Sequence, residues 1–337
     1  TFKNDLNNIK NELFNKYFFI ELSKINKNKK QISCRRFNNK VANKVFMFLF
    51  EEFNKEINRE YSIDKLISKL NSKTKKVDFL NVDTLAGVLT QTDVLISCLG
   101  ITRQQDGFSY MDIDYQANLN VLEEAKKAGV KKVIYVAVYK GEQFKKTALC
   151  AAKEKFVQEV KKSGLEYCIV RPTGFFSDMA DFFDMALKGK VYLFGDGSCS
   201  INPIHGYDLA KEMIELTSLE KDLIQELNIG GPVSYTQKEL AELAFKALRK
   251  PIKIVYIPNF FRRLTLKAGK LFISTKVFGP IEFFLSLMSV DMNAPLYGHK
   301  EITSFFDIIS VNNLATYKIC SFRMCHQVRL IQIFKKW

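Results

Sequence analysis

The sequence predicts an α/β fold built on a doubly wound parallel sheet, with a smaller C-terminal region. Residues 92–100, 131–138 and 165–172 are almost entirely apolar, as expected of strands that are covered on both faces. Residues 110–128 and 148–163, which separate them, carry apolar side chains at helical spacing. This alternation predicts parallel strands joined by right-handed helical crossovers.

Glycine and proline mark where these elements end. Gly100 ends the first strand, Gly129 and Gly164 stop the two helices, and Pro172 ends the third strand. Because the carboxyl ends of parallel strands meet at one edge of a sheet, we expect Gly100 and Thr173 to lie at the same edge.

Weaker signals flank this core on both sides. Residues 77–80 predict a short strand and residues 83–89 a small helix. Residues 209–217 predict a helix, with Asp208 as its cap. Glycine-rich turns at 195–197 and 230–232 indicate a more mixed C-terminal part.

The two ends differ from the middle in composition. Residues 1–76 contain 18 Lys and Arg against 8 Asp and Glu, and residues 311–337 contain 5 against 0. The middle, residues 77–310, has 28 of each, so the net charge of +15 belongs to the ends and does not predict nucleic-acid binding. We expect a Lys- and Asn-rich extension at 1–73, helical or disordered, and a basic tail at 308–337.

Composition also limits the compartment and the metal chemistry. The seven cysteines are odd in number and scattered, which favours reduced thiols. Cys320, Cys325 and His326 lie close together but lack further ligands at zinc spacing, so we expect no metal site. No apolar run approaches the roughly 20 residues of a membrane span. The default expectation is cytoplasmic, although a chain that begins with Thr1 leaves a targeting peptide open. The oligomeric state is not predicted.

Four patches, in order, resemble the atypical and extended short-chain dehydrogenases, in particular the NmrA-like and NAD(P)H-binding epimerase-like branch. They are TDVLISCLG (92–100), DIDYQANLNVLEEAKKAGVKKVIYVAV (112–138), RPTGFF (171–176), and the pair GDGSCSINPIHGYDLAKEMIEL (195–216) and NIGGPVSYTQKELAELA (228–244). The resemblance extends over about residues 74–307 and implies a Rossmann-like domain that binds NAD or NADP and a small-molecule substrate.

The resemblance also implies site residues. Lys153 matches the family's catalytic lysine, which binds the nicotinamide ribose; the alternative is a solvated helix lysine. The implied cofactor-binding residues are Ser97, Cys98, Leu99, Gly100, Lys153, Pro172, Thr173 and Gly174. The implied substrate-binding residues are Arg103, Phe175 and Phe176, and Arg103 could equally be an exposed side chain. His205 matches a family histidine that usually packs or caps, and Tyr139 could replace a missing hydroxyl.

Three departures from the family pattern concern the chemistry itself. The family's catalytic tyrosine is replaced by Leu149, and its serine falls near Ala137 or Val138. Leucine cannot donate a proton, so acid catalysis by that residue is lost. Residues 1–86 contain no glycine, so the family's G-x-x-G-x-x-G loop, whose amide groups bind the pyrophosphate, is missing.

The missing loop predicts weak or absent cofactor binding. Each charge-assisted hydrogen bond contributes about 1.5–3 kcal/mol, so losing two or three weakens a dissociation constant by about a thousandfold. The resemblance therefore implies an NAD(P)-binding oxidoreductase or isomerase-like protein with impaired cofactor binding. Within the branch, R-P-x-G-F-F at 171–176 and DMNAPLYG at 291–298 resemble divinyl chlorophyllide reductases. Two alternatives stay open: a non-catalytic scaffold on the same fold, comparable to the complex I accessory subunit, and the product of a truncated or frameshifted gene.

Overall fold

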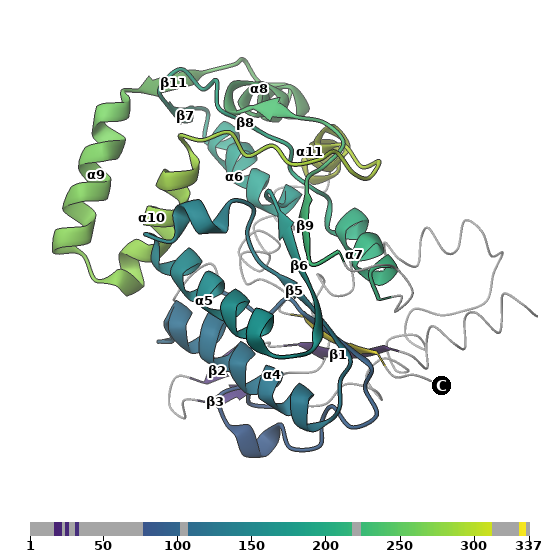
Figure 1. Ribbon diagram of the computed structural model, residues 1–337. Coiled ribbons are helices and arrows are strands. Elements are labelled where there is room, and N and C mark those ends of the chain that lie inside the picture. Colours follow the sequence, from purple (N-terminus) through teal and green to yellow (C-terminus); the bar gives the residue numbers. More distant parts are fainter. Residues whose placement is uncertain are drawn as a thin grey trace, which may run out of the picture.

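The computed structural model describes residues 77–101, 107–217 and 224–311, together with the backbone of four strands near the two ends of the chain (Figure 1). Those four strands are β1 (Tyr17–Glu21), β2 (Lys24–Asn26), β3 (Gln31–Ser33) and β12 (Leu330–Phe334).

A six-stranded sheet in the order β1-β12-β4-β5-β6-β9 forms the centre of the molecule. Strands β4 (Val94–Ser97), β5 (Lys132–Val136), β6 (Glu166–Pro172) and β9 (Glu226–Ile229) are parallel neighbours. The predicted doubly wound parallel sheet is therefore confirmed, and the ends of β4 and β6 that precede Gly100 and Thr173 lie at one edge.

Helices cover both faces of these strands because successive strand residues point in opposite directions. On one face, Leu95, Val133 and Ile169 share a buried cluster with α4 (Asn118–Lys127) and α5 (Ala148–Lys162). On the other face, alternate strand residues pack against α7 (Gly206–Glu215); they are Val94, Ile96, Ile134, Val136, Cys168 and Val170.

Most of the predicted boundaries agree with these elements, and one predicted strand is wrong. The predicted helix at 110–128 is a π-helix, η2 (Met111–Ala117), that continues into α4. Residues 77–80 form a turn rather than a strand, and η1 (Val82–Thr84) is a short 3-10 helix. The reason is local, because the Thr84 hydroxyl donates to the Asp78 carbonyl and accepts from the Asp78 amide, which competes with strand pairing.

The two ends of the chain contribute strands to the central sheet, where helices or disorder were expected for residues 1–73. Strand β12 pairs antiparallel with β4, and β1 pairs antiparallel with β12. Both segments, YFFIE and LIQIF, are rich in the aromatic and β-branched residues that favour strands. The position beside β4 is therefore held by a segment from the far end of the chain.

The C-terminal part packs around a second buried cluster, formed mainly by α6 (Phe176–Leu187), α8 (Gln237–Ala247) and α11 (Ile302–Val311). Two small sheets join it, and a pair of helices stands at its margin (Figure 1). The remaining elements are η3 (Gly141–Phe144), β7 (Val191–Phe194), β8 (Ser200–Ile201), β10 (Tyr235–Thr236), β11 (Ile254–Ile257), α9 (Asn259–Phe272) and α10 (Thr275–Leu287). Among the described residues, no helix combines the length and apolar character that crossing a bilayer requires.

Candidate functional site

Lys153 is held in an ion pair at the carboxyl edge of the sheet. Its ammonium lies 3.1 Å from Asp114 Oδ1 and 3.5 Å from the Tyr135 hydroxyl. The Lys153 side chain is 12% exposed and that of Asp114 is fully buried, so the alternative of a solvated lysine is wrong. Burial alone would lower the pKa of Lys153, but the attraction and hydrogen bonds of Tyr135 and Asp114 outweigh it and raise that pKa. Lys153 is therefore a fixed cation.

The loop after β4 is anchored to the helix that follows it. The Ser97 hydroxyl lies 2.6 Å from Asn118 Oδ1, and Asn118 Nδ2 donates to the Leu99 carbonyl at 3.0 Å. The Ile101 amide donates to Asp114 Oδ2 at 3.1 Å. Of the predicted cofactor-binding residues here, Ser97, Leu99 and Gly100 are buried and Cys98 is half-buried. Their side chains thus serve the protein's own packing, and the backbone is what remains to meet a ligand.

Gly100 is required by this cluster. A Cβ added at Gly100 would lie 2.6 Å from Asp114 Oδ1 and 2.9 Å from Lys153 Nζ. Both distances are too short for a carbon atom, so the ion pair occupies the space that any other residue would need. The structure gives the glycine a steric reason within the chain itself.

The turn after β6 is also held by hydrogen bonds within the protein. The Thr173 hydroxyl donates to the Asn202 carbonyl at 2.6 Å, and the Thr173 amide donates to the Ile229 carbonyl at 3.2 Å. Pro172 and Thr173 are buried, whereas Gly174 is half-buried. This turn therefore joins β6 to β9 and to the C-terminal part.

The positions of the missing catalytic groups face the protein interior. Leu149 is 2% exposed and belongs to the core between the sheet and α5. Ala137 is buried and Val138 is half-buried. Tyr139 donates its hydroxyl to the Asn293 carbonyl at 2.6 Å, which ties it to the C-terminal part. None of these four side chains, as placed, presents a proton donor to the edge of the sheet.

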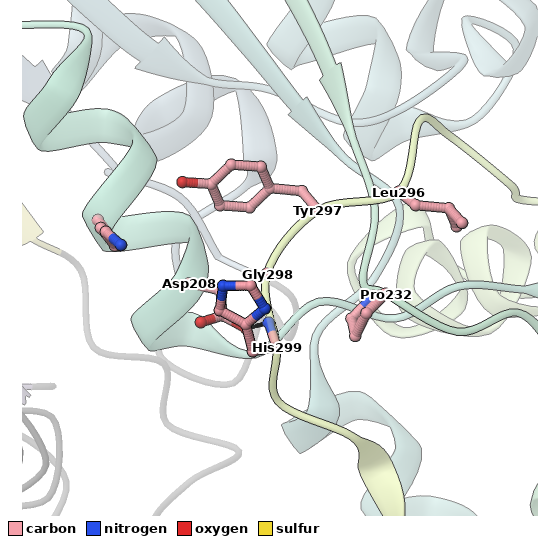
Figure 2. Close-up of a pocket in the computed structure, with 7 residues that line it drawn as sticks. Asp208, Pro232, Leu296, Tyr297, Gly298 and His299 are labelled. Atoms are coloured by element: carbon pink, nitrogen blue, oxygen red, sulfur yellow. Dashed lines mark hydrogen bonds between the residues drawn. The ribbon is translucent and has the colours of Figure 1, made fainter.

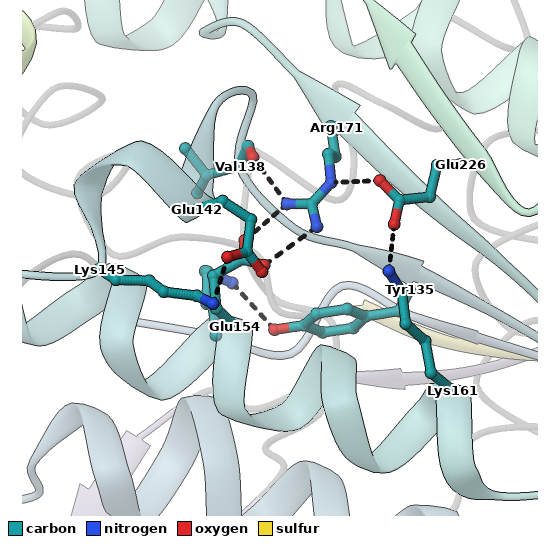
Figure 3. Close-up of polar contacts among 9 residues, drawn as sticks. Tyr135, Val138, Glu142, Lys145, Glu154, Lys161, Arg171 and Glu226 are labelled. Carbon is teal, nitrogen blue, oxygen red and sulfur yellow. Dashed lines mark hydrogen bonds and ion pairs between the residues drawn. The ribbon is translucent and has the colours of Figure 1, made fainter.

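A second polar cluster links α5 to β6 and β9 (Figure 3). The Arg171 guanidinium makes a bidentate pair with Glu154, at 2.5 and 3.0 Å, and donates through Nε to Glu226 at 3.2 Å. Lys161 also contacts Glu226, at 2.5 Å. Burial would raise the pKa of Glu226, but its bonds to Lys161 and Arg171 prevail and lower it. The arginine of R-P-x-G-F-F is therefore a structural cation.

A surface hollow of about 350 Å³ lies beyond β9, beside the start of α7 (Figure 2). Its lining residues are Asp208, Lys211, Pro232, Leu296, Tyr297, Gly298 and His299, none of which is a predicted site residue. The predicted capping role of Asp208 is wrong, because Asp208 accepts from the amides of His299 and Lys300 at 3.1 Å. His205 is the cap of α7 and accepts from the Tyr207 amide through Nδ1, which agrees with its expected capping role.

Two of the three predicted substrate residues lie at the start of α6. Phe176 is buried in the C-terminal cluster, with its ring 5.2 Å from that of His205, and Phe175 is half-buried. Arg103 lies outside the described residues. Sequence reasoning did not single out Asp114 and Asn118, although their spacing of four on the helix that follows Gly100 was a usable signal.

Thiols and metal ligands give no further site in the described part of the chain. Cys98, Cys150, Cys168 and Cys199 are free, and burial raises the pKa of Cys168 to about 11. No group of three or more His, Cys, Asp or Glu side chains there is arranged to hold a metal ion. Cys320, Cys325 and His326 lie outside the described residues.

The residues at this edge suit the nicotinamide ribose of a dinucleotide better than its pyrophosphate. An ammonium has three donors, and Asp114 and Tyr135 account for two of those of Lys153, which leaves one for a ribose hydroxyl. The pyrophosphate half needs a strand that ends at this edge and leads into a helix N-terminus. Antiparallel β12 instead begins there, since its Ile331 pairs with Ser97.

Comparison with known proteins agrees with this reading of the fold. Residues 57–200 match a family model described as NAD(P)H-binding, a range that begins within the segment 1–73 set apart by composition. A nucleoside-diphosphate-sugar epimerase from Staphylococcus aureus superposes with a TM-score of 0.54 at 15% identity, covering 80% of this chain and 97% of that one. An NADPH-dependent quinone oxidoreductase from Escherichia coli, complexed with NADPH, gives 0.54 at 13% identity, covering 79% and 96%.

The names of the curated relatives describe several different roles. The chloroplastic divinyl chlorophyllide a 8-vinyl-reductase of Arabidopsis thaliana is 33% identical over 184 residues, 49% of this chain and 42% of the relative. Photosystem II assembly factor Ycf39 of Guillardia theta is 24% identical over 188 residues, 54% and 60%. The 40 kDa subunit of Neurospora crassa NADH-ubiquinone oxidoreductase is 22% identical over 183 residues, 54% and 49%. The chain thus spans less than two thirds of the length of each of these relatives. Together with the NAD(P)H-binding match, these similarities confirm the resemblance to atypical short-chain dehydrogenases.

Proposed function

We propose that this chain is an atypical short-chain dehydrogenase, an oxidoreductase-like protein whose cofactor site is half formed. Its match to an NAD(P)H-binding family model and its Rossmann-like fold support this proposal. The observation that carries the proposal is the shared edge of β4, β5 and β6, along which Gly100, with Lys153 beside it, and the Pro172–Gly174 turn both lie. In open α/β sheets this edge is where ligands bind.

Lys153 has the central role in the half that is present. It holds a positive charge beside the backbone of Gly100 and keeps one donor for the nicotinamide ribose. The bound nicotinamide supplies hydride-transfer chemistry. The protein's own part is to orient that ring with Lys153 and with the backbone of Ser97–Gly100 and Pro172–Gly174, while Phe175, Phe176 and Arg103 are proposed to meet a small-molecule substrate.

Two features limit the strength of cofactor binding. Residues 1–86 contain no glycine. The strand beside β4 is β12, which is antiparallel and begins at this edge, so it does not lead into a helix N-terminus there. Without hydrogen bonds to the pyrophosphate, NAD or NADP affinity falls by about a thousandfold, to the millimolar range for a cofactor that otherwise binds at micromolar concentration.

A second candidate is a scaffold without catalysis. It is favoured by Leu149, which lies in the core where a proton donor is expected, and by Lys153, whose partners Asp114 and Tyr135 explain its burial without a ligand. Relatives named as an assembly factor and as a respiratory-complex subunit are consistent with it. Several relatives carry chloroplastic or mitochondrial names, which favours an organelle over the cytoplasmic default.

Calorimetric titration with NADPH and NADH tests the proposal. The chain as it stands should bind with a dissociation constant near millimolar. A chimera with a family strand, G-x-x-G-x-x-G loop and helix in place of residues 1–73 should bind tighter, by at most about a thousandfold. Within the chimera, Lys153→Met should weaken binding, whereas Lys155→Met, at an exposed lysine on the same helix, should not. Micromolar binding by the natural chain would overturn the proposal, and absence of binding by both would support the scaffold.

A further inference from the structure

Helices α9 and α10 form a hairpin that stands at the margin of the molecule, away from the central sheet (Figure 1). At Gly269 the backbone of α9 lies directly on the Phe278 ring, since an added Cβ would be 2.0 Å from Phe278 Cε2. Arg262 donates from α9 to the Leu285 carbonyl at 3.0 Å, and Lys270 pairs with Glu282 at 2.6 Å. The hairpin is therefore a fixed unit with defined inner and outer faces.

The outer face of α9 is apolar. Phe260, Leu264 and Leu271 lie four and seven residues apart, which places them on one stripe of the helix. All three are exposed, Leu271 at 76%, and the neighbouring Phe272 is 80% exposed. On a surface helix of a globular protein such residues normally face a core, so this stripe indicates a partner.

Helix α10 adds a second exposed apolar stripe. Val277, Ile281 and Phe284 lie four and three residues apart and are exposed, while Phe278 and Leu285 are buried on an adjacent side of the helix. The hairpin thus presents aromatic and branched side chains outward from both helices.

The hairpin and the residues before it carry a net positive charge. Residues 243–281 contain nine Lys and Arg and no Asp or Glu, although residues 77–310 as a whole are neutral. Lys270 is neutralised by Glu282, but no ion pair is found for Arg263 or Lys267 among the described residues. By helical spacing Lys267 lies at the edge of the apolar stripe of α9, between Leu264 and Leu271, and Arg263 lies beside it on the same side.

We infer that the α9–α10 hairpin docks on an anionic lipid surface, with the apolar stripe among the acyl chains and the flanking cations at the headgroups. An amphipathic helix with bulky apolar residues on one side and basic residues beside them is suited to lie in a bilayer interface. At about 1.5 Å per residue, the 14 residues of α9 measure roughly 21 Å and suit a position along the surface. Residues 259–287 contain five Lys and Arg against one Glu, and this net positive charge favours anionic lipid over a hydrophobic protein groove.

Flotation of the full chain with vesicles tests this inference. Binding is expected to vesicles of phosphatidylcholine and phosphatidylglycerol in equal parts, and to be weaker for phosphatidylcholine alone. The triple variant Phe260→Ser/Leu271→Ser/Phe272→Ser should lose binding at least about tenfold, because each side chain contributes apolar area. Arg263→Gln/Lys267→Gln should lower binding to anionic vesicles and reduce its sensitivity to salt.

Matched controls separate docking from loss of fold. Val82→Ser/Ile224→Ser/Ile308→Ser removes exposed apolar residues away from the hairpin and should leave vesicle binding unchanged. Lys127→Gln/Lys162→Gln removes two exposed positive charges away from the hairpin and should likewise leave vesicle binding unchanged. Circular dichroism should match for all variants. The inference is overturned if the chain fails to float, or if the hairpin and control variants float equally. It is also overturned if light scattering shows a dimer that the hairpin variant converts to a monomer without any vesicle binding.

Discussion

Among single residues, Gly100 couples the backbone of the β4 loop to the Asp114–Lys153 ion pair. Gly100→Ala should lower the free energy of unfolding by about 1–3 kcal/mol, because the new methyl group would overlap Asp114 Oδ1 and Lys153 Nζ. Gly206→Ala is the matched control, since nothing lies within 4 Å of an added Cβ there. Urea unfolding of the three proteins measures the difference, and equal losses at both positions would contradict the steric account.

His205 makes the stability of α7 dependent on pH. Burial lowers the pKa of His205 below its ordinary value of 6.5, while Asp208 raises it and Lys300 lowers it further. The cap needs a neutral Nδ1 to accept from the Tyr207 amide. The unfolded chain therefore takes up a proton first, and stability that is complete above about pH 6.5 declines as the pH falls below it.

Substitution of His205 tests whether stability declines as the pH falls. His205→Asn supplies a cap that does not titrate, so the loss of unfolding free energy between pH 7.5 and pH 5.5 should be smaller in the variant than in the natural chain. The measurement is urea unfolding at both pH values. The same decline in both proteins would mean that other groups govern this pH range.

Within and between elements, the buried Arg171 joins α5 to β6 and β9. Arg171→Met should cost about 3–5 kcal/mol, because it leaves the Glu154 carboxylate buried without its partner. The double variant Arg171→Met/Glu154→Gln should recover part of that loss. Lys161→Met, which removes a partly exposed pair with Glu226, should cost at most about 1 kcal/mol. Chemical denaturation distinguishes these outcomes, and an Arg171 variant as stable as the Lys161 variant would contradict the role assigned to the pair.

The elements that sequence reasoning predicted well are those specified by local pattern. Strands β4, β5 and β6 and helices α4 and α5 have apolar periodicity and end near glycine or proline, so their bounds follow from residues close in the chain. Residues 77–80 were mispredicted because the side chain of Thr84 diverts the backbone of Asp78 into a turn. The positions of Asp114 and Lys153 were harder to predict, since their contact depends on how η2 and α5 pack against each other on one face of the sheet.

For the whole molecule, the order of strands at the β4 edge could not be predicted from local pattern. Strand β12 comes from the opposite end of the chain, and pairing over such a separation leaves no periodic signal. The basic composition of the two end segments indicated that they differ from the middle, but not that they would supply strands. The common edge of Gly100 and Thr173 was predicted correctly because both residues follow strands that sequence alone identifies.

The strand order leads to a prediction about cofactor affinity. Because β12 occupies the place beside β4, a grafted strand and glycine loop must displace it before a phosphate site can form. The apparent dissociation constant rises in proportion to the fraction of molecules in which β12 keeps that place. The chimera that replaces residues 1–73 should therefore bind NADPH at least about tenfold tighter when residues 330–337 are also removed.

Two further proteins isolate the role of β12 in this competition. Removal of residues 330–337 from the natural chain should not restore binding, because no glycine precedes Gly87 to form the loop. Hydrogen exchange should show that the β4 amides lose protection in this shortened chain and regain it in the shortened chimera, where the grafted strand pairs with β4. Equal NADPH affinity for the two chimeras, measured by calorimetry, would show that β12 does not compete for the β4 edge and that the missing glycine loop alone accounts for weak binding.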